Sequence, residues 1–120
     1  MSHTCDAFVV TCIDFRFQKY IKRFTNTTLK GKLYDMVGFA GVTKDLPTIM
    51  NQLGISVRLH HTKKAIFIHH EDCGAYGKES TYKRHVTDLH QAKKAVRAKY
   101  PTLKVDLYYL HLDGKFEKVS

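Results

Sequence analysis

The sequence AFVVTCIDFR, residues 7–16, places a short apolar run directly before polar side chains at alternate positions. Its first five residues have the length and the β-branched composition of a buried parallel strand. A second stretch of the same design, AIFIHHEDCG at residues 65–74, leads a predicted strand into two histidines. The carboxyl ends of parallel strands lie at one edge of a sheet, where α/β proteins bind their ligands. We therefore expect the polar residues of both stretches to meet at that edge.

The rest of the chain alternates between helical and strand patterns. Apolar residues recur at spacings of three and four in some segments and form short β-branched runs in others. The expected helices cover residues 17–24, 45–61 and 80–100, and the further expected strands cover residues 32–37, 105–112 and 115–119. Thr43 or Asp45 could cap the second helix, and Gly54 could interrupt it.

Strands that alternate with helices predict right-handed βαβ units and an α/β fold, with a mostly parallel β-sheet flanked by helices. Asp113 and Gly114 have the sequence of a hairpin turn, so we expect the last strand to be an antiparallel addition at the C-terminal edge of the sheet. A length of 120 residues fits a single domain over residues 1–120.

The composition is that of an ordinary globular protein, with 43% hydrophobic and 26% charged residues. No run approaches the roughly 20 apolar residues of a membrane span, and the first residues lack the pattern of a signal peptide. We therefore expect a cytoplasmic protein without a membrane partner. The net charge of +9 does not by itself predict nucleic-acid binding, because the lysines are spread over the polar faces of the expected helices. The positive field could instead draw small anions into a cleft.

Cys12, His70 and Cys73 are the residue types that bind zinc. Two thiolates and one imidazole leave a tetrahedral Zn²⁺ one open position, which is typical of a catalytic site. The chain has three cysteines, which cannot pair completely, so metal binding is favoured over disulfides. Cys5 is expected to take no part. The alternative is a buried core cysteine beside a polar loop, but burial explains none of the neighbouring polar residues.

These residues carry a resemblance to a known family. Cys-x-Asp-x-Arg at residues 12–16, followed by His-x-x-Cys-Gly at residues 70–74, resembles the signature pair of the β-class carbonic anhydrases. The resemblance covers most of the chain. It implies a zinc lyase that reversibly hydrates carbon dioxide to bicarbonate, and it implies a homodimer or a higher homo-oligomer. The chain departs from the family at Gly38 and Phe39, where the family usually has Arg and Asn.

Asp14 and Arg16 are the expected catalytic residues. A planar guanidinium can grip both carboxylate oxygens and turn Asp14 away from the metal. Asp14 could then accept a hydrogen bond from zinc-bound hydroxide and orient it toward carbon dioxide. If Arg16 releases it, Asp14 could become the fourth ligand, and such closed forms are known in the family that the chain resembles. The alternative is a surface ion pair that contributes little.

The substrate pocket is expected to include Phe15, Tyr34, Phe39 and Gly74. The three aromatic side chains could line an apolar pocket for carbon dioxide, or they could equally pack in the core. Gly74 allows the turn after Cys73 and could expose backbone N–H groups near the metal.

Two other functions stay open. The same site could hydrolyse carbonyl sulfide or carbon disulfide, because the shape of the pocket separates these substrates and the sequence does not show that shape. A zinc-binding homologue without catalysis, used for interaction or sensing, is favoured by the altered residues Gly38 and Phe39.

Overall fold

The computed structural model describes residues 3–120, and strands alternate with helices along most of them. The strands are β1 (Ala7–Thr11), β2 (Tyr34–Gly38), β3 (Lys64–His70), β4 (Lys104–Leu110) and β5 (Phe116–Val119). The helices are α1 (Gln18–Thr28), α2 (Leu46–His60) and α3 (Tyr82–Lys99), with short 3-10 helices at η1 (Phe15–Phe17) and η2 (Gly77–Glu79). Each strand and α-helix overlaps a segment predicted from the sequence. Within residues 3–120, no helix combines the length and the apolar character that a membrane crossing requires.

The strands form one sheet in the order β2-β1-β3-β4-β5. β1 to β4 run parallel, and β5 pairs antiparallel with β4 at the edge. This arrangement confirms the fold class that the sequence predicts. The chain steps from β1 outward to β2 and then returns past β1 to β3, so the strand order reverses between β1 and β3. Open α/β sheets bind ligands at such a switch point.

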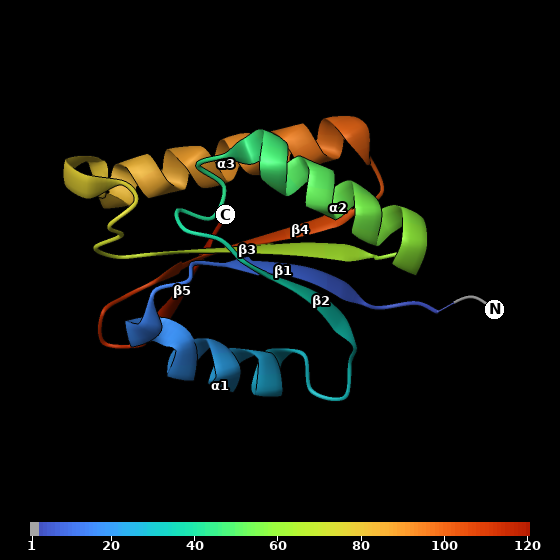
Figure 1. Ribbon diagram of the computed structural model, residues 1–120, viewed down its shortest axis with the longest axis horizontal. Coiled ribbons are helices and arrows are strands. Elements are labelled where there is room, and N and C mark those ends of the chain that lie inside the picture. Colours follow the sequence, from blue (N-terminus) through green and yellow to red (C-terminus); the bar gives the residue numbers. More distant parts are fainter. Residues whose placement is uncertain (1–2) are drawn as a thin grey trace.

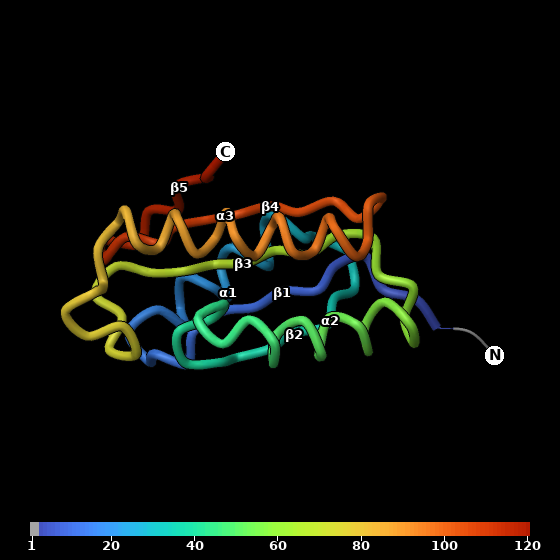
Figure 2. The backbone as a smooth tube through the Cα atoms, turned by 90° about the horizontal axis from the view of Figure 1, so that it is seen from above, coloured from blue at the N-terminus to red at the C-terminus, as the bar shows by residue number. Residues whose placement is uncertain are grey.

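Helices cover both faces of the sheet (Figure 1). α1 lies on one face, and α2 and α3 lie on the other, where the view from above separates them (Figure 2). The alternation of side chains along β1 explains this division: Phe8 and Val10 pack with α2 and α3, whereas Ala7 and Val9 pack with α1. Because both faces are covered, β1 and β3 are buried almost throughout, which accounts for their continuous apolar sequences.

Gly54 does not interrupt α2, contrary to one expectation from the sequence. The helix is capped by Asp45, whose carboxylate accepts a hydrogen bond from the backbone N–H of Thr48. Gly54 lies beside the end of α3, where a Cβ would be 3.3 Å from the hydroxyl oxygen of Tyr100. The glycine therefore serves the close packing of two helices and does not mark a break.

Gly114 brings the turn between β4 and β5 into close contact with α1. Its φ is +92°, and a Cβ at this position would lie 2.5 Å from Cε1 of Tyr20. Its carbonyl oxygen accepts a hydrogen bond of 3.0 Å from Nη2 of Arg23. The absence of a side chain at Gly114 thus allows α1 to pack against this edge of the sheet.

We expect Gly114→Ala to lower the free energy of unfolding by about 2–4 kcal/mol, because the left-handed φ and the displacement of Tyr20 both cost energy. Gly31→Ala is the matched control, since Gly31 has φ +73° but nothing within 4 Å of an added Cβ. It should lose only about 1–2 kcal/mol. Urea unfolding of both variants measures the difference, and equal losses would show that the contact with Tyr20 contributes nothing.

Candidate metal centre

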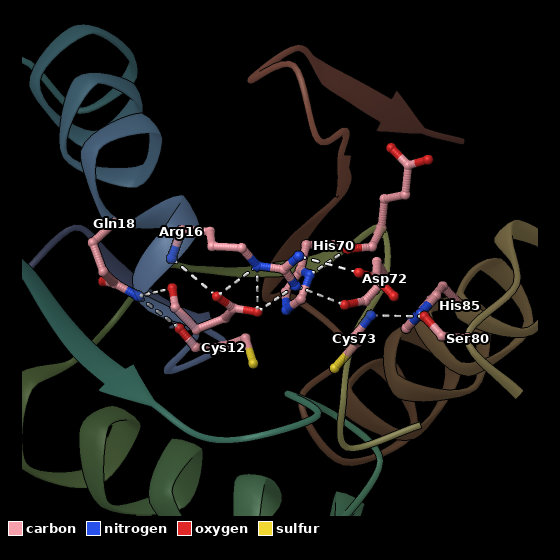
Figure 3. A network of polar contacts seen from close by, with 10 residues as sticks. Cys12, Arg16, Gln18, His70, Asp72, Cys73, Ser80 and His85 are labelled. Atoms are coloured by element: carbon pink, nitrogen blue, oxygen red, sulfur yellow. Dashed lines mark hydrogen bonds and ion pairs between the residues drawn. The ribbon is translucent and has the colours of Figure 1, made fainter. Parts of the chain in front are cut away.

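Three ligand-type side chains converge at the switch point between β1 and β3. Cys12 directly follows β1, His70 ends β3, and Cys73 lies in the loop that follows. Their ligand atoms all lie within 4.8 Å of one another, and all three residues are buried. Figure 3 shows the two sulfur atoms and the His70 ring around one common space. The structure therefore brings together the three residues that the sequence suggests as metal ligands.

The His70 ring is held so that one nitrogen remains available. Nδ1 lies 2.7 Å from the carbonyl oxygen of Glu71, which can only accept, so Nδ1 donates this hydrogen bond. Nε2 is buried and has no hydrogen-bond partner among residues 3–120. A buried polar atom without a partner is costly. A metal ion bound by Nε2 and the two sulfur atoms would remove that cost, so these residues fit a metal.

The two cysteines and the histidine are electrostatically coupled. A hydrogen bond from the Cys73 thiol lowers the pKa of Cys12, and His70 stabilises the same thiolate. The contact with Cys12 in turn raises the pKa of Cys73. Burial alone would lower the pKa of His70, but the Cys12 thiolate and the Glu71 carbonyl outweigh it and raise that pKa. Negative charge is thus concentrated on sulfur, as a borderline-soft cation such as Zn²⁺ requires.

Arg16 grips Asp14 beside the three ligand-type residues. Its Nε and Nη2 atoms both donate to the Asp14 carboxylate, at distances down to 2.7 Å, and its backbone N–H donates to Oδ1 at 2.9 Å. These hydrogen bonds hold the pKa of Asp14 below its usual range. Arg16 also donates to the side chain of Asp72 at 3.1 Å and to its carbonyl oxygen at 3.0 Å. One cation therefore joins the segment after β1 to the loop that carries Cys73.

A chain of hydrogen-bonded polar groups also supports the loop that carries Cys73. The backbone N–H of Cys73 donates to Oγ of Ser80 at 2.8 Å, and Ser80 lies 2.9 Å from Nε2 of His85. Nδ1 of His85 is 2.8 Å from Nδ1 of His69, whose Nε2 lies 2.7 Å from the Thr43 hydroxyl. Burial lowers the pKa of His85 to about 4 and also lowers that of His69. Both rings are therefore neutral near pH 7 and can serve as links in a hydrogen-bonded chain.

Sequence reasoning missed most of this support. His85 does carry a signal, because it stands in helical register with Leu89, Ala92 and Val96 in the buried stripe of α3. Ser80 and Thr43 lie outside regular elements and carry no comparable signal. Gln18, the first residue of α1, also carries no such signal, and its Nε2 donates to the carbonyl oxygens of Cys12 at 3.2 Å and Asp14 at 2.9 Å.

A largely apolar hollow of about 390 Å³ opens beside the three ligand-type residues. Its lining consists of Cys12, Ile13, Asp14, Phe15, Ala40, Gly74 and Ala75. Phe15 and Gly74 thus lie at the hollow, as the sequence suggests. The Phe15 side of the hollow faces solvent, because this residue is 84% exposed.

The assignment of Tyr34 to this pocket is wrong. Tyr34 begins β2, and the parallel register places it opposite Ala7, at the start of β1. It lines a different hollow, at the amino ends of the strands. The assignment of Phe39 also needs correction, because this ring is half-buried and packs against the hydrophobic core, as the alternative of core packing foresaw.

Comparisons with known proteins agree with this geometry. A family model described as "Putative carbonic anhydrase" matches residues 2–120. An uncharacterized protein of Rickettsia bellii is 28% identical, with 92% of this chain and 79% of the relative covered. An uncharacterized protein of Rickettsia conorii is 26% identical, with 92% and 70% covered. Among solved structures, the b-carbonic anhydrase CafA of Aspergillus fumigatus has a TM-score of 0.55 at 14% identity. The match covers 99% of this chain and 76% of that chain, and it shows that the two proteins share a fold.

We expect Cys12→Ser to lose one equivalent of zinc per chain, because a neutral hydroxyl is a far weaker zinc ligand than a thiolate. Zinc content is measured after loading and dialysis. Thr87→Ser, at an exposed position of α3, is the control and should keep the wild-type content. An unchanged zinc content in folded Cys12→Ser protein would rule out this residue as a ligand.

Proposed function

The chain belongs to this carbonic anhydrase family, and we propose that it catalyses the zinc-dependent, reversible hydration of carbon dioxide to bicarbonate. The proposal assigns zinc to Cys12, His70 and Cys73, and it assigns the orientation of the reactants to Asp14 and Arg16. When bound, zinc supplies a Lewis acid that brings the pKa of a coordinated water from 15.7 toward about 7.

The observation that carries the proposal is that the Nε2 atom of His70, beside two thiols, has no hydrogen-bond partner in the described part of the chain, residues 3–120. Structural zinc sites have four protein ligands, whereas catalytic sites have three and leave a position open for the reacting molecule. Asp14 lies two residues after Cys12 in the sequence, but it is not part of the group within 4.8 Å, and Arg16 engages its carboxylate. A centre of three ligands with a restrained acid beside it is suited to hydration chemistry.

The role proposed for Asp14 follows from its charge and its partners. Because its pKa is lowered, Asp14 is ionised near neutral pH and can only accept hydrogen bonds. It can therefore accept a hydrogen bond from the attacking water and direct the oxygen lone pair toward carbon dioxide. Arg16 keeps the carboxylate ionised and fixes its orientation through contacts of Nε with Oδ1 and of Nη2 with Oδ2. Without that restraint, Asp14 could compete for the open metal position.

The hollow offers a suitable environment for an apolar substrate. Ile13, Phe15 and Ala40 contribute apolar surface, and Cys12 and Asp14 contribute the polar side next to the candidate centre. Carbon dioxide has no net charge, so its transfer from water into this apolar hollow costs little free energy. Bicarbonate is an anion, and the net charge of +9 would favour its approach in the reverse reaction.

We also propose that a second copy of this chain covers the hollow in a homodimer or a higher homo-oligomer. Ile13 is 63% exposed and Phe15 is 84% exposed, and both line the hollow. Large apolar side chains beside a cleft are typical of surfaces that a partner covers. The ligand thiols must stay reduced, which favours a cytoplasmic protein.

The second candidate function is zinc binding without catalysis, and the glycine at position 38 favours it. A Cβ on Gly38 would lie 3.8 Å from Cγ2 of Ile13, so this position borders the hollow. The β-class enzymes that the chain resembles usually carry Arg and Asn at positions 38 and 39. The absence of these polar side chains from this chain removes groups that could contact a substrate.

We expect Arg16→Ala and Asp14→Ala to keep zinc but to lower the rate of carbon dioxide hydration by about a hundredfold or more, because a misplaced reacting group costs about this much. Arg16→Lys should not restore the rate, since an ammonium group cannot make the two-point contact. Arg58→Ala, at an exposed position of α2, is the control. Wild-type rates in both alanine variants would show that the pair is only structural.

We expect turnover to rise from neutral to alkaline pH, with a midpoint above about 7, because two thiolates reduce the effective charge of the metal and leave the water less acidic than in an all-histidine site. Stopped-flow hydration assays measure the profile on zinc-loaded protein. Zinc content is determined at each pH, because protons compete with the metal for His70 and the thiols. A background rate at every pH in fully loaded, folded protein would favour zinc binding without turnover.

A further inference from the structure

A second group of ligand-type side chains lies near the opposite edge of the sheet. Cys5, Asp35 and His60 place their ligand atoms within 4.8 Å of one another. They come from the segment before β1, from β2 and from the last residue of α2. At about 3.3 Å per residue along β1, this group is roughly 20 Å from the centre formed by Cys12, His70 and Cys73.

The backbone brings the three segments together. The N–H group of Cys5 donates to the carbonyl oxygen of His60 at 3.0 Å, and the N–H group of Asp6 donates to the carbonyl oxygen of Leu33 at 2.8 Å. α2 ends at His60, and the next residue, His61, has a left-handed φ of 53° that turns the chain away. Main-chain contacts thus help to hold the three side chains in position, as a preorganised site requires.

Asp35 is the centre of the polar contacts in this group. Its Oδ2 atom accepts from Nδ1 of His60 at 2.7 Å, from Oγ of Ser56 at 2.7 Å and from the thiol of Cys5 at 3.7 Å. Burial tends to raise the pKa of Asp35, but the contacts with His60 and Ser56 outweigh it and lower that pKa. Asp35 thus contacts both of the other ligand-type side chains.

The group is accessible from one side and supported from the other. A hollow of about 270 Å³ opens onto Cys5, Asp35 and His60. The hydroxyl groups of Ser56 and Thr62 are buried behind it, at 2.7 Å from Asp35 and 3.3 Å from Cys5, respectively. Ligating carboxylates are commonly hydrogen-bonded by such outer groups. A thiol, a carboxylate and an imidazole thus face a space that an ion can enter from solvent.

His3 lies at the mouth of the same hollow. Its ring centroid is 4.9 Å from that of His60, and it contributes to the lining together with Tyr34. A fourth ligand to a tetrahedral ion could therefore come from His3 or from water. The hydrogen bonds that Asp35 accepts from His60 and Ser56 would satisfy the carboxylate without any cysteine.

We propose that Cys5, Asp35 and His60 form a second metal site, which binds Zn²⁺ through one thiolate, one carboxylate and one imidazole. These are the ligand types that zinc accepts in tetrahedral sites. Binding would release the thiol proton of Cys5 to solvent. The ion would join the N-terminal segment to β2 and α2, and it would stabilise the folded chain because the unfolded chain does not hold the three ligands together. The site shares no residue with the candidate metal centre and does not depend on the proposed hydration activity.

Zinc titration of six metal-free proteins, the wild type and five variants, tests the proposal, with a chromophoric chelator as the competitor. The wild type should bind two equivalents, Cys5→Ser and Cys12→Ser should each bind one, and the double variant should bind none. Asp35→Asn and His60→Gln, each combined with Cys12→Ser, should lose the same equivalent as Cys5→Ser. Zinc should raise the melting temperature of Cys12→Ser but not that of the double variant. Cys5→Ser should retain any hydration activity of the wild type, which separates this proposal from the preceding one.

A second measurement follows the proposed ligand Cys5 directly, through the rate at which its thiol is alkylated. The chain has three cysteines, so Cys5 is the single thiol in the variant that combines Cys12→Ser with Cys73→Ser. One equivalent of zinc should slow the alkylation of this thiol at least tenfold, and His60→Gln in the same background should abolish the protection. Alkylation that zinc does not slow, or a second equivalent that persists in both Cys5→Ser and His60→Gln, would overturn the proposal.

Discussion

The parallel pairing of β1 with β3 is the constraint on which the candidate metal centre depends. Val10 pairs with Phe67 in this register, so the residues that follow in each strand lie at the same edge. The reversal of strand order at this pair leaves the edge accessible, because the connections on either side lead away in opposite directions. Two buried strands thus deliver a thiol and an imidazole to one point. Burial of both strands, which helices on the two faces provide, makes this point rigid.

Rigid strands alone would leave the loop with Cys73 free to move. Contacts on two sides restrain it: Arg16 binds the side chain and the carbonyl oxygen of Asp72, and Ser80 accepts the N–H of Cys73. Asp72 has a left-handed φ of 57°, which these contacts help to hold. Arg16 therefore acts on both halves of the centre, since it orients an acid after β1 and the loop after β3. A change at this residue therefore removes contacts to Asp72 as well as to Asp14.

The sequence predicts the features that depend on local pattern. Buried parallel strands have continuous apolar runs and amphipathic helices have a clear period, so the elements and the meeting of Cys12 with His70 follow from the printed residues. What depends on the packing of distant segments could not be predicted. Gly54 has the sequence of a helix break but serves the contact with Tyr100. Tyr34 has the chemistry of a pocket residue, but its place in β2 puts it at the other end of the sheet.

Cys5 is the opposite case, a residue for which the sequence predicts no role in a site. It stands outside every ligand spacing, and only the fold brings it to Asp35 and His60. Parallel strands collect their carboxyl ends at one edge and their amino ends at the other, so a doubly wound sheet can hold polar clusters at both. The carboxyl edge receives loops that lead out of buried strands, whereas the amino edge receives the ends of helices such as α2. Ligands at the carboxyl edge are therefore recognisable from strand sequences, and ligands at the amino edge become recognisable only when the helix that delivers them is placed in three dimensions.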